Sequence, residues 1–245
     1  DWLVTSDIDV LAMQETKCKD EQFPRAAFEA AGYDIVAHGL NQWNGVAFAS
    51  RIPAEDVEIG FSGMPAFGKE GKEAVEEARA IGATFNGVRL WSLYVPNGRE
   101  LENDHYKYKL AWMKRLIDHL NADTKSSDQV VVTGDYNIAP ADIDVYNPAD
   151  FVGATHVSEA ERQVLRDLEA WGMVDVFRQQ HPDDKLFSWW DYRAGGFNQN
   201  KGMRIDLIMA TQSVADKSRW TIVDRQARKG EKPSDHAPVL VDIDV

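Results

Sequence analysis

Residues 130–140, VVVTGDYNIAP, contain the change of character on which the fold assignment depends. Three valines and a threonine form a short β-branched run, which is typical of a strand buried in a sheet. Gly134, Asp135 and Asn137 follow at once, so a carboxylate and a carboxamide stand where the strand leaves the core. Acidic and amide residues after glycine are usually turn chemistry. From this stretch alone, a turn and a functional site both remain open.

The chain is large enough to bury a sizeable core, with 245 residues of which 44% are hydrophobic. At roughly 100 to 200 residues per domain this could be one domain or two, and we expect a single domain over residues 1–245 because no linker or repeat interrupts it. No apolar run approaches the roughly 20 residues that cross a bilayer, so we expect a soluble protein with no membrane partner. Cys18 is the single cysteine, which indicates a reducing, cytoplasmic setting.

The net charge of the whole chain is −13, and this overall negative charge argues against a polyanionic partner. Basic side chains nevertheless gather in three segments. A local basic rim and ordinary surface charge therefore both remain open. The three groups are Lys17 and Lys19; Arg193, Lys201 and Arg204; and Arg225, Arg228, Lys229 and Lys232.

The pattern of apolar residues predicts strands that alternate with a few helices. Helices are expected at residues 21–31, 104–121 and 158–171, the last with a capping box from Ser158 to Glu161 and a terminating Gly172. Ten strands and three helices indicate a layered α/β protein with two packed sheets. The expected strands are residues 9–14, 33–39, 45–50, 78–87, 88–96, 129–134, 185–192, 204–211, 219–224 and 237–245.

Polar residues recur at or near the ends of these strands, and each has an ordinary explanation alone. A glutamate at a strand end is usually a solvated edge, although Asp206 is less ordinary because a carboxylate inside a strand is costly without a partner. Together these are the residue types that magnesium-assisted phosphoester cleavage requires. In such a reaction a histidine held by an aspartate can stabilise negative charge on the phosphate oxygens. The set is Glu15, Asp135, Asn137, Asp206, Asp235 and His236.

Zinc chemistry is not indicated, because the chain has no HExxH motif and no Cys/His cluster. The remaining histidines show no ligand spacing in the sequence; they are His38, His105, His119, His156 and His181.

Six ordered motifs, LAMQETK, LYVPNG, VVTGDYNIAP, FSWWDYR, MRIDLIMA and KPSDHAPV, carry a family resemblance that covers essentially the whole chain. In order and spacing the chain resembles the exonuclease III group of apurinic/apyrimidinic endonucleases, within the endonuclease/exonuclease/phosphatase superfamily. The resemblance implies a DNase I-like α/β fold, a four-layered sandwich of two mixed β-sheets flanked by helices.

By similarity, Glu15 would be the principal metal ligand, and Asp235 would lie near a second or alternative metal position. The cofactor would be Mg²⁺, with Mn²⁺ as an alternative. Asp135 would orient or deprotonate the attacking water, Asn137 would help to hold that water or a phosphate oxygen, and Tyr94 would donate to the scissile phosphate.

The resemblance also assigns His236 to a non-bridging phosphate oxygen, with Asp206 accepting from its other ring nitrogen and fixing the tautomer. These parts suit an in-line displacement at phosphorus without a covalent enzyme intermediate.

Substrate recognition is expected from the segment LFSWWDYRAGGFNQNKGMR. Trp189 would help to wall a pocket for an extruded baseless sugar, and Arg193, Lys201 and Arg204 would contact the DNA backbone. The implied function is hydrolysis of the phosphodiester 5′ to abasic sites in double-stranded DNA by a monomer, with 3′-phosphodiesterase and 3′–5′ exonuclease activity. A superfamily phosphatase acting on a small phosphorylated molecule and a non-catalytic DNA-damage binder remain alternatives.

Family members carry a strand with an Asn-bearing motif upstream of QETK. The stretch DWLVTSD at the start of this sequence resembles the tail of the helix that should follow that strand. We therefore expect that the native protein has an upstream strand, and that the sequence as given is a single domain that lacks this N-terminal strand.

Overall fold

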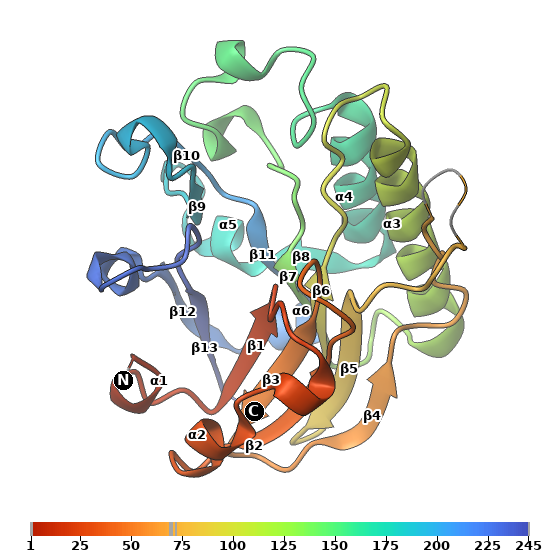
Figure 1. Cartoon of the computed structure of the whole chain (residues 1–245), viewed down its shortest axis with the longest axis vertical. Coiled ribbons are helices and arrows are strands. Elements are labelled where there is room, and N and C mark those ends of the chain that lie inside the picture. The colour runs from red at the N-terminus through yellow and green to blue at the C-terminus, as the bar shows by residue number, and fades with distance from the viewer. Residues whose placement is uncertain (1, 69–70, 72, 245) are drawn as a thin grey trace.

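The computed structural model describes residues 2–68, 71 and 73–244. Asp1, in the expected helix tail, and Val245, in the expected last strand, lie outside the described residues. A six-stranded sheet forms the centre of the molecule (Figure 1), and all its pairings are antiparallel except β6 with β7. In spatial order its strands are β4 (Glu55–Ile59), β5 (Ala80–Phe85), β6 (Val88–Tyr94), β7 (Val130–Asp135), β11 (Asp206–Thr211) and β8 (Met173–Asp175).

A second layer of strands is divided into two antiparallel pieces. The first has the order β1 (Val10–Gln14), β3 (Val46–Ser50) and β2 (Asp34–His38), and the second is the pair β12 (Ser218–Val223) and β13 (Val239–Ile243). A short pair, β9 (Trp189–Trp190) and β10 (Gly202–Met203), lies apart from both. The expected second sheet is therefore present as two antiparallel pieces rather than as one mixed sheet.

Helices cover the free face of the central sheet and the ends of the molecule. The long helices α3 (Asp104–Asp123) and α4 (Glu159–Trp171) lie side by side in Figure 1 and pack on the central sheet through Trp112, Leu116 and Leu165. The shorter helices are α1 (Trp2–Thr5), α2 (Arg25–Glu29), α5 (Val176–Gln180) and α6 (Gln212–Ala215), with 3-10 turns at Asp20–Gln22, Asp142–Asp144, Pro148–Phe151, Arg193–Gly195 and Arg225–Lys229. Among the described residues, no helix has both the length and the apolar character that crossing a bilayer requires.

The expected start and stop of α4 are both present. The Ser158 side chain accepts from the backbone N–H of Glu161, the Glu161 carboxylate accepts from the backbone N–H of Ser158, and Gly172 follows with φ 125°. The helix expected over residues 21–31 is instead a 3-10 turn and the short helix α2. Pro24 separates them, because proline has no N–H to continue a helix.

Three strands, β4, β8 and the two-residue β10, were not predicted, and one is shorter than predicted. β4 is an edge strand whose acidic, exposed sequence EDVEI hides the usual apolar signal, and β8 has only three residues. The expected strand 185–192 is reduced to β9, because Ser188 donates to Met203 while Trp190 donates to Asp235. This segment bridges two elements and does not pair continuously with either.

A slot separates the two pieces of the second layer. It has a volume of about 680 Å³, its walls are β1 and β13, and its floor includes Val88, Leu90 and Val131 of the central sheet. Among the named strands of the described chain, β1 pairs only with β3, and β13 pairs only with β12. Asp206 and His236 also line this slot, so the slot reaches the polar residues singled out from the sequence.

Candidate active site

Three of the expected site residues form a row across neighbouring strands of the central sheet. Tyr94 at the end of β6 is paired with Asp135 at the end of β7, and Asp135 is paired with Asp206 at the start of β11. Residues opposite each other on adjacent strands have side chains about 4.5 to 5.5 Å apart when they share a face. Register alone therefore brings together residues that are far apart in the sequence.

The glycine in VVVTGDYN has a steric role beside this row. Gly134 has φ 140°, and a Cβ atom there would lie 2.0 Å from the carbonyl oxygen of Leu93 on the parallel neighbour β6. A side chain at this position would push β6 and β7 apart and disturb the pairing of Tyr94 with Asp135. Gly134, Asp135 and Asn137 therefore form a turn and also position the candidate site, so the two interpretations of this stretch are compatible.

Asn137 fixes the orientation of Asp135. Its backbone N–H and its Nδ2 donate to the two carboxylate oxygens of Asp135 at 2.8 and 3.0 Å, and Nδ2 also donates to the carbonyl of Val95 at 3.0 Å. Asn137 has φ 51°, a left-handed conformation that costs about 1 to 3 kcal/mol and persists only where the surroundings impose it. The Asp135 carboxylate is therefore held by donors that leave it little freedom to rotate.

An imidazole and a carboxylate form the expected pair at the other end of the row. His236 Nδ1 lies 3.0 and 2.9 Å from the two oxygens of Asp206, which leaves Nε2 as the nitrogen available to a substrate. Burial would lower the pKa of His236, but the negative charges of Asp206 and Asp135 outweigh burial and raise that pKa to about 10. The imidazole is therefore a cation at neutral pH.

Asp135 has the electrostatics of a base poised near neutrality. Its pKa is raised to about 7, mainly by burial and also by the repulsion of Asp206 and Glu15, while the His236 cation and the N–H of Asn137 oppose the rise. A carboxyl group with a pKa near the working pH can both take and release a proton, which is the property of a general base.

Glu15 follows β1 and points into the same cleft, with φ 52° at the exit of the strand. It accepts a hydrogen bond from the Tyr94 hydroxyl and forms an ion pair of 2.6 Å with Lys17. Burial alone would raise the pKa of Glu15, but the hydrogen bonds from Lys17 and Tyr94 outweigh it and hold the pKa below its ordinary value. The side chain is thus a carboxylate at any working pH.

The donor set fits a magnesium ion held mainly by Glu15. Within the described residues, no three donor atoms of this cluster lie within 4.8 Å of one another, whereas Mg²⁺ needs only one or two carboxylates and completes its shell with waters and phosphate oxygens. The mutual repulsion that raises the pKa of Asp135 is also an excess of negative charge that a divalent cation would relieve.

Comparison with known proteins places this geometry in a family. A model described as the Endonuclease/Exonuclease/phosphatase family matches residues 1–236. The chain belongs to that family. Exodeoxyribonuclease of Bacillus subtilis (strain 168) is 31% identical over 257 residues, with 100% of this chain and 91% of the relative covered.

Solved structures of relatives have the same fold. An AP endonuclease from Archaeoglobus fulgidus superposes with a TM-score of 0.91 at 36% identity, with 100% of this chain and 92% of the other covered. A 3′ phosphatase from Neisseria bound to a product DNA hairpin gives a TM-score of 0.92 at 35% identity, with the same coverages. These matches confirm the exonuclease III resemblance and the DNase I-like α/β fold.

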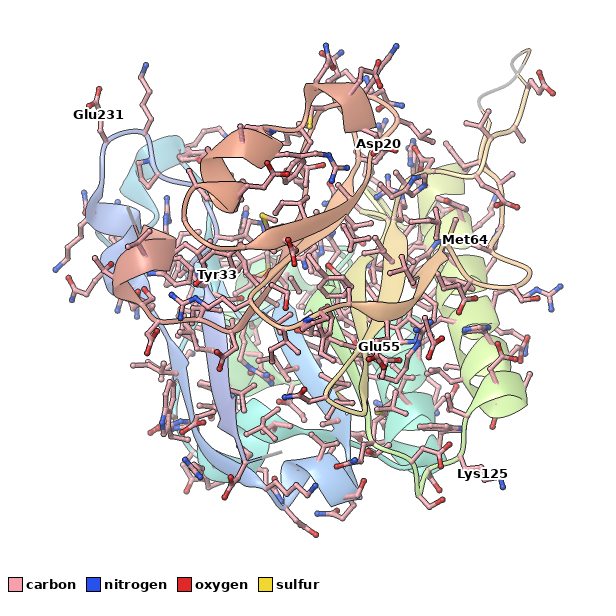
Figure 2. All side chains as sticks on the ribbon, turned by 90° about the horizontal axis from the view of Figure 1, so that it is seen from below. Asp20, Tyr33, Glu55, Met64, Lys125 and Glu231 are labelled. Atoms are coloured by element: carbon pink, nitrogen blue, oxygen red, sulfur yellow. The ribbon has the colours of Figure 1, made fainter. Side chains whose placement is uncertain are left out.

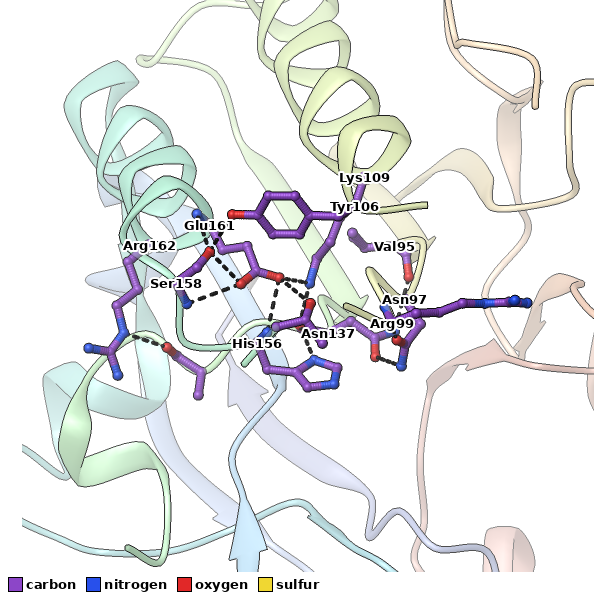
Figure 3. Close-up of polar contacts among 12 residues, drawn as sticks. Val95, Asn97, Arg99, Tyr106, Lys109, Asn137, His156, Ser158, Glu161 and Arg162 are labelled. Carbon is purple, nitrogen blue, oxygen red and sulfur yellow. Dashed lines mark hydrogen bonds and ion pairs between the residues drawn. The ribbon is translucent and has the colours of Figure 1, made fainter. Parts of the chain in front are cut away.

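Behind Asn137 lies a buried ionic network that the sequence analysis missed (Figure 3). Lys109 of α3 and Glu161 of α4 form an ion pair with both side chains 0% exposed, and Lys109 Nζ donates to the carbonyl of Asn137 at 2.6 Å. His156 Nδ1 lies 2.5 Å from the same carbonyl. Burial and, next to it, the positive charge of Lys109 together lower the pKa of His156 to about 4, so this ring is neutral.

This network ties the turn at Asn137 to the two helices α3 and α4. Glu161 also accepts from Thr155 at 2.8 Å and caps α4 through Ser158, so one carboxylate serves both the helix start and the site. The sequence analysis had recorded Glu161 only as part of a capping box. Lys109 follows the exposed Lys107 by two positions on α3, and nothing in the local sequence distinguishes the two lysines.

Trp189 and Asp235 lie beside the imidazole. Trp189 forms an isolated β-bridge with His236, and its indole Nε1 donates to Asp235 at 3.0 Å. Their positions suit the expected roles as pocket wall and site carboxylate, which remain predictions.

The expectation that Arg204 contacts DNA is wrong. Its side chain is fully buried, where its guanidinium pairs with Asp144 at 2.6 Å and with Asp175 at 2.8 Å. The positive charge of Arg204 is neutralised by these two carboxylates inside the fold, so the guanidinium cannot reach a ligand. Arg193 and Lys201 differ, because both are exposed in the loop that follows β9.

Two exposed aromatic residues near the site were also missed. Trp43 is 70% exposed in the loop before β3, and the neighbouring Asn44 accepts from the backbone N–H of Lys17, two residues after Glu15. Tyr192, next to Arg193, is 62% exposed. An exposed tryptophan beside a polar cleft is a signal of ligand contact, but the sequence does not show which of eight tryptophans is exposed.

Proposed function

We propose that the protein is a Mg²⁺-dependent DNA-repair nuclease that hydrolyses the phosphodiester bond 5′ to an abasic site in double-stranded DNA. The observation that carries the proposal is the row of Tyr94, Asp135 and Asp206. The row lies at one end of the strands of the central sheet and is flanked by His236 and Glu15. The names of the relatives, an exodeoxyribonuclease and an AP endonuclease, support the class of substrate.

Asp135 takes the proton of the attacking water. Its pKa of about 7 makes it a competent base near neutral pH, and the two donors from Asn137 hold the carboxylate in one orientation. Positioning of this kind, together with proton transfer, contributes roughly 10²- to 10⁴-fold to a reaction rate.

His236 and Tyr94 stabilise the charge that develops on the phosphate oxygens. The His236 cation presents Nε2, since Asp206 occupies Nδ1, and the Tyr94 hydroxyl can move from Glu15 to a phosphate oxygen. Mg²⁺ at Glu15 would supply Lewis-acid polarisation of the scissile phosphate when bound. These groups suit in-line attack by water without a covalent intermediate, because Asp135 is held in place to take the proton of that water.

Selection of an abasic site follows from the walls of the cleft. A baseless sugar is small and unpaired, so the pocket beside Trp189 can admit it and exclude an intact nucleotide. Trp43, Arg193 and Lys201 would contact the DNA on either side. The same centre can act at a 3′ end, which accounts for proposed 3′-phosphodiesterase and 3′–5′ exonuclease activities and agrees with the name of the Neisseria relative.

A gel assay of a duplex with one tetrahydrofuran site tests the proposal. We expect a single nick 5′ to that site with Mg²⁺, slower cleavage with Mn²⁺, no cleavage with EDTA and no internal nick in the intact duplex. Hydrolysis of an inositol phosphate without nicking would favour the phosphatase alternative. Salt-sensitive binding to the abasic duplex without nicking would favour a damage binder.

We also propose that an additional strand of the native protein lies in the slot between β1 and β13. A separate proposal is that the domain acts as a monomer in the cytoplasm. The slot supports the strand, because unpaired edges face each other over an apolar floor and each buried unpaired backbone group costs about 1 to 3 kcal/mol. The free Cys18 agrees with the cytoplasm.

Adding a family-like segment ahead of Asp1 tests the strand. We expect a higher unfolding temperature and faster Mg²⁺-dependent nicking than for residues 1–245 alone. Equal stability and equal activity of the two proteins would contradict the placement. Size-exclusion chromatography with light scattering tests the monomer.

A further inference from the structure

Three groups that commonly bind metals meet at the other end of the central sheet. Glu58 of the edge strand β4 and His119 and Asp123 of α3 have donor atoms that all lie within 4.8 Å of one another. His119 and Asp123 are four residues apart on one helix and therefore occupy the same face. The sequence analysis found no ligand spacing around this histidine, because Glu58 reaches it only through the tertiary structure.

His119 is a buried donor without a hydrogen bond. The residue is 4% exposed, and its Nδ1 has no hydrogen-bond partner among the described residues, although Asp123 Oδ2 lies 3.2 Å away outside bonding geometry. Such an orphaned buried nitrogen is uncommon in a folded protein. Ligands bound to one ion at about 2.0 to 2.2 Å in tetrahedral geometry lie at a similar spacing, so these two atoms need little movement to share a metal.

The ring is held in place by aromatic neighbours. It stacks on Phe61 with ring centroids 5.7 Å apart and meets the edge of Trp91 at 5.2 Å. The carboxylates lie at the rim, with side chains 39% and 51% exposed for Glu58 and Asp123. Glu58 Oε1 is 4.0 Å from the other ring nitrogen, Nε2, so Glu58 has to shift for the two carboxylates to share one ion. A rigid imidazole with two adjustable carboxylates is a workable arrangement for a divalent cation.

The surroundings are acidic and open to solvent. A cavity of about 430 Å³ contains the three groups and is also lined by Asp56, Asp128 and Arg89. Arg89 binds the second oxygen of Glu58 at 2.8 Å and opposes a cation, but four carboxylates and the C-terminal end of α3 outweigh this one positive charge. Figure 2 shows the two elements concerned, with Glu55 at the start of β4 and Lys125 just after α3 labelled.

We propose that Glu58, His119 and Asp123 form a Zn²⁺ site that links the edge strand β4 to the end of α3. One imidazole nitrogen and two carboxylates suit a borderline metal such as Zn²⁺ better than Mg²⁺, which prefers an all-oxygen shell. The remaining coordination position opens to the cavity and would hold water. The site stabilises the fold and takes no part in the proposed reaction.

The site is separate from the catalytic centre. The cavity touches Arg89 and Val130 near the first residues of β6 and β7, whereas Tyr94 and Asp135 are the last residues of the same strands. The cavity also reaches Trp91, which is level with Glu58 across β5, so it ends three residues, or about 10 Å of strand, before Tyr94. Zinc at one centre can therefore be measured with the other disabled.

Calorimetric titration of Zn²⁺ into the metal-free full chain tests the site, in a Glu15→Gln background that removes the catalytic ligand. We expect one equivalent to bind, and Asp123→Asn to weaken binding by at least about 10-fold, the lower range for disturbing a metal shell. Saturating Zn²⁺ at about 100 times Kd should raise the unfolding temperature by about 5 °C or more. Asp118→Asn, on the same helix outside the cluster, should leave both results unchanged.

His119→Gln should abolish the Zn²⁺ response, but it also alters a buried ring. Asp123→Asn changes a half-exposed carboxylate at constant shape and is the variant that decides. Its Mg²⁺-dependent nicking should equal that of the unsubstituted chain. Equal Zn²⁺ affinity with and without Asp123→Asn, or no binding to the Glu15→Gln chain below millimolar Zn²⁺, would overturn the proposal.

Discussion

The two ends of the central sheet hold their polar groups in different ways. At the last residues of β6 and β7, the backbone register places Tyr94 beside Asp135, and Asn137 donates to both oxygens of that carboxylate. At the opposite end, Glu58 and His119 come from an edge strand and a helix and approach only through their side chains. The first arrangement is fixed by the fold, and the second can adjust.

This difference follows from what each end has to do. A base must be held within a fraction of an ångström of its working position for catalysis, because small displacements cost large factors in rate. Capture of an ion tolerates more movement, since the ion itself draws the carboxylates together. The following predictions disturb the fixed end and compare it with the adjustable one.

Asp135→Asn should have the largest effect on nicking of abasic DNA. Removing the general base should reduce the rate by roughly 10²- to 10⁴-fold, while the shape of the side chain is kept. Asp56→Asn in the cavity at the opposite end serves as the matched control and should leave the rate unchanged. A fall of less than about threefold for Asp135→Asn, with the far-ultraviolet spectrum intact, would remove Asp135 from the reaction.

Lys109→Met should destabilise the fold more than any surface change. It leaves Glu161 buried without its partner, and breaking a buried ion pair from one side costs about 3 to 5 kcal/mol. Lys107 is exposed on the same helix, so Lys107→Met should leave the free energy of unfolding measured in urea nearly unchanged.

Glu161→Gln added to Lys109→Met should recover part of the lost stability, because it removes the uncompensated charge. If the double variant is no more stable than Lys109→Met, the effect is one of packing rather than of charge.

Asp206→Asn should have an intermediate effect. The loss of the carboxylate that holds His236 Nδ1 should slow nicking by about 10- to 100-fold, as outer partners of functional histidines do. It should also lower the pKa of His236 from about 10, because the main favourable charge is gone. Nuclear magnetic resonance titration of the ring measures this directly, and an unchanged pKa would show that Asp206 does not act through the imidazole.

Within one pH unit of neutrality the expected effect is the most modest, and it needs no substitution. Asp135 must be ionised to act, and since its pKa is raised to about 7, the rate should fall about 10-fold per pH unit below 7. On the alkaline side the rate should decline as His236 loses its proton near pH 10. A rate independent of pH between 5 and 7, at constant Mg²⁺, would contradict the raised pKa.

Much of the fold could be predicted from local patterns. The apolar runs located ten of the strands, and the pair Ser158 and Glu161 gave the start of α4, because such signals act over a few residues. β4 escaped because an exposed edge strand need not be apolar. The split second layer escaped because pairing between strands far apart in the chain leaves no periodic signal.

The site could be predicted in kind but not in geometry. The resemblance selected Glu15, Asp135 and His236, which the structure brings to one cleft, but it also selected Arg204, which is buried. Charge in a sequence does not reveal whether an arginine meets solvent or two aspartates. Lys109 and Trp43 were missed for the same reason, since burial and exposure are decided by packing.

The sequence by itself determined the chemical groups, the local turns and the family of this protein. Gly134 can adopt φ 140° because it has no side chain, and Pro24 interrupts a helix because it has no N–H; both properties follow from the covalent structure of the residues. The tertiary structure alone decided that Tyr94, Asp135 and Asp206 form a row, that Asp135 titrates near 7, and that Glu58 meets His119. The physical reason is that register, burial and electric field depend on groups distant in the chain, which only folding brings together.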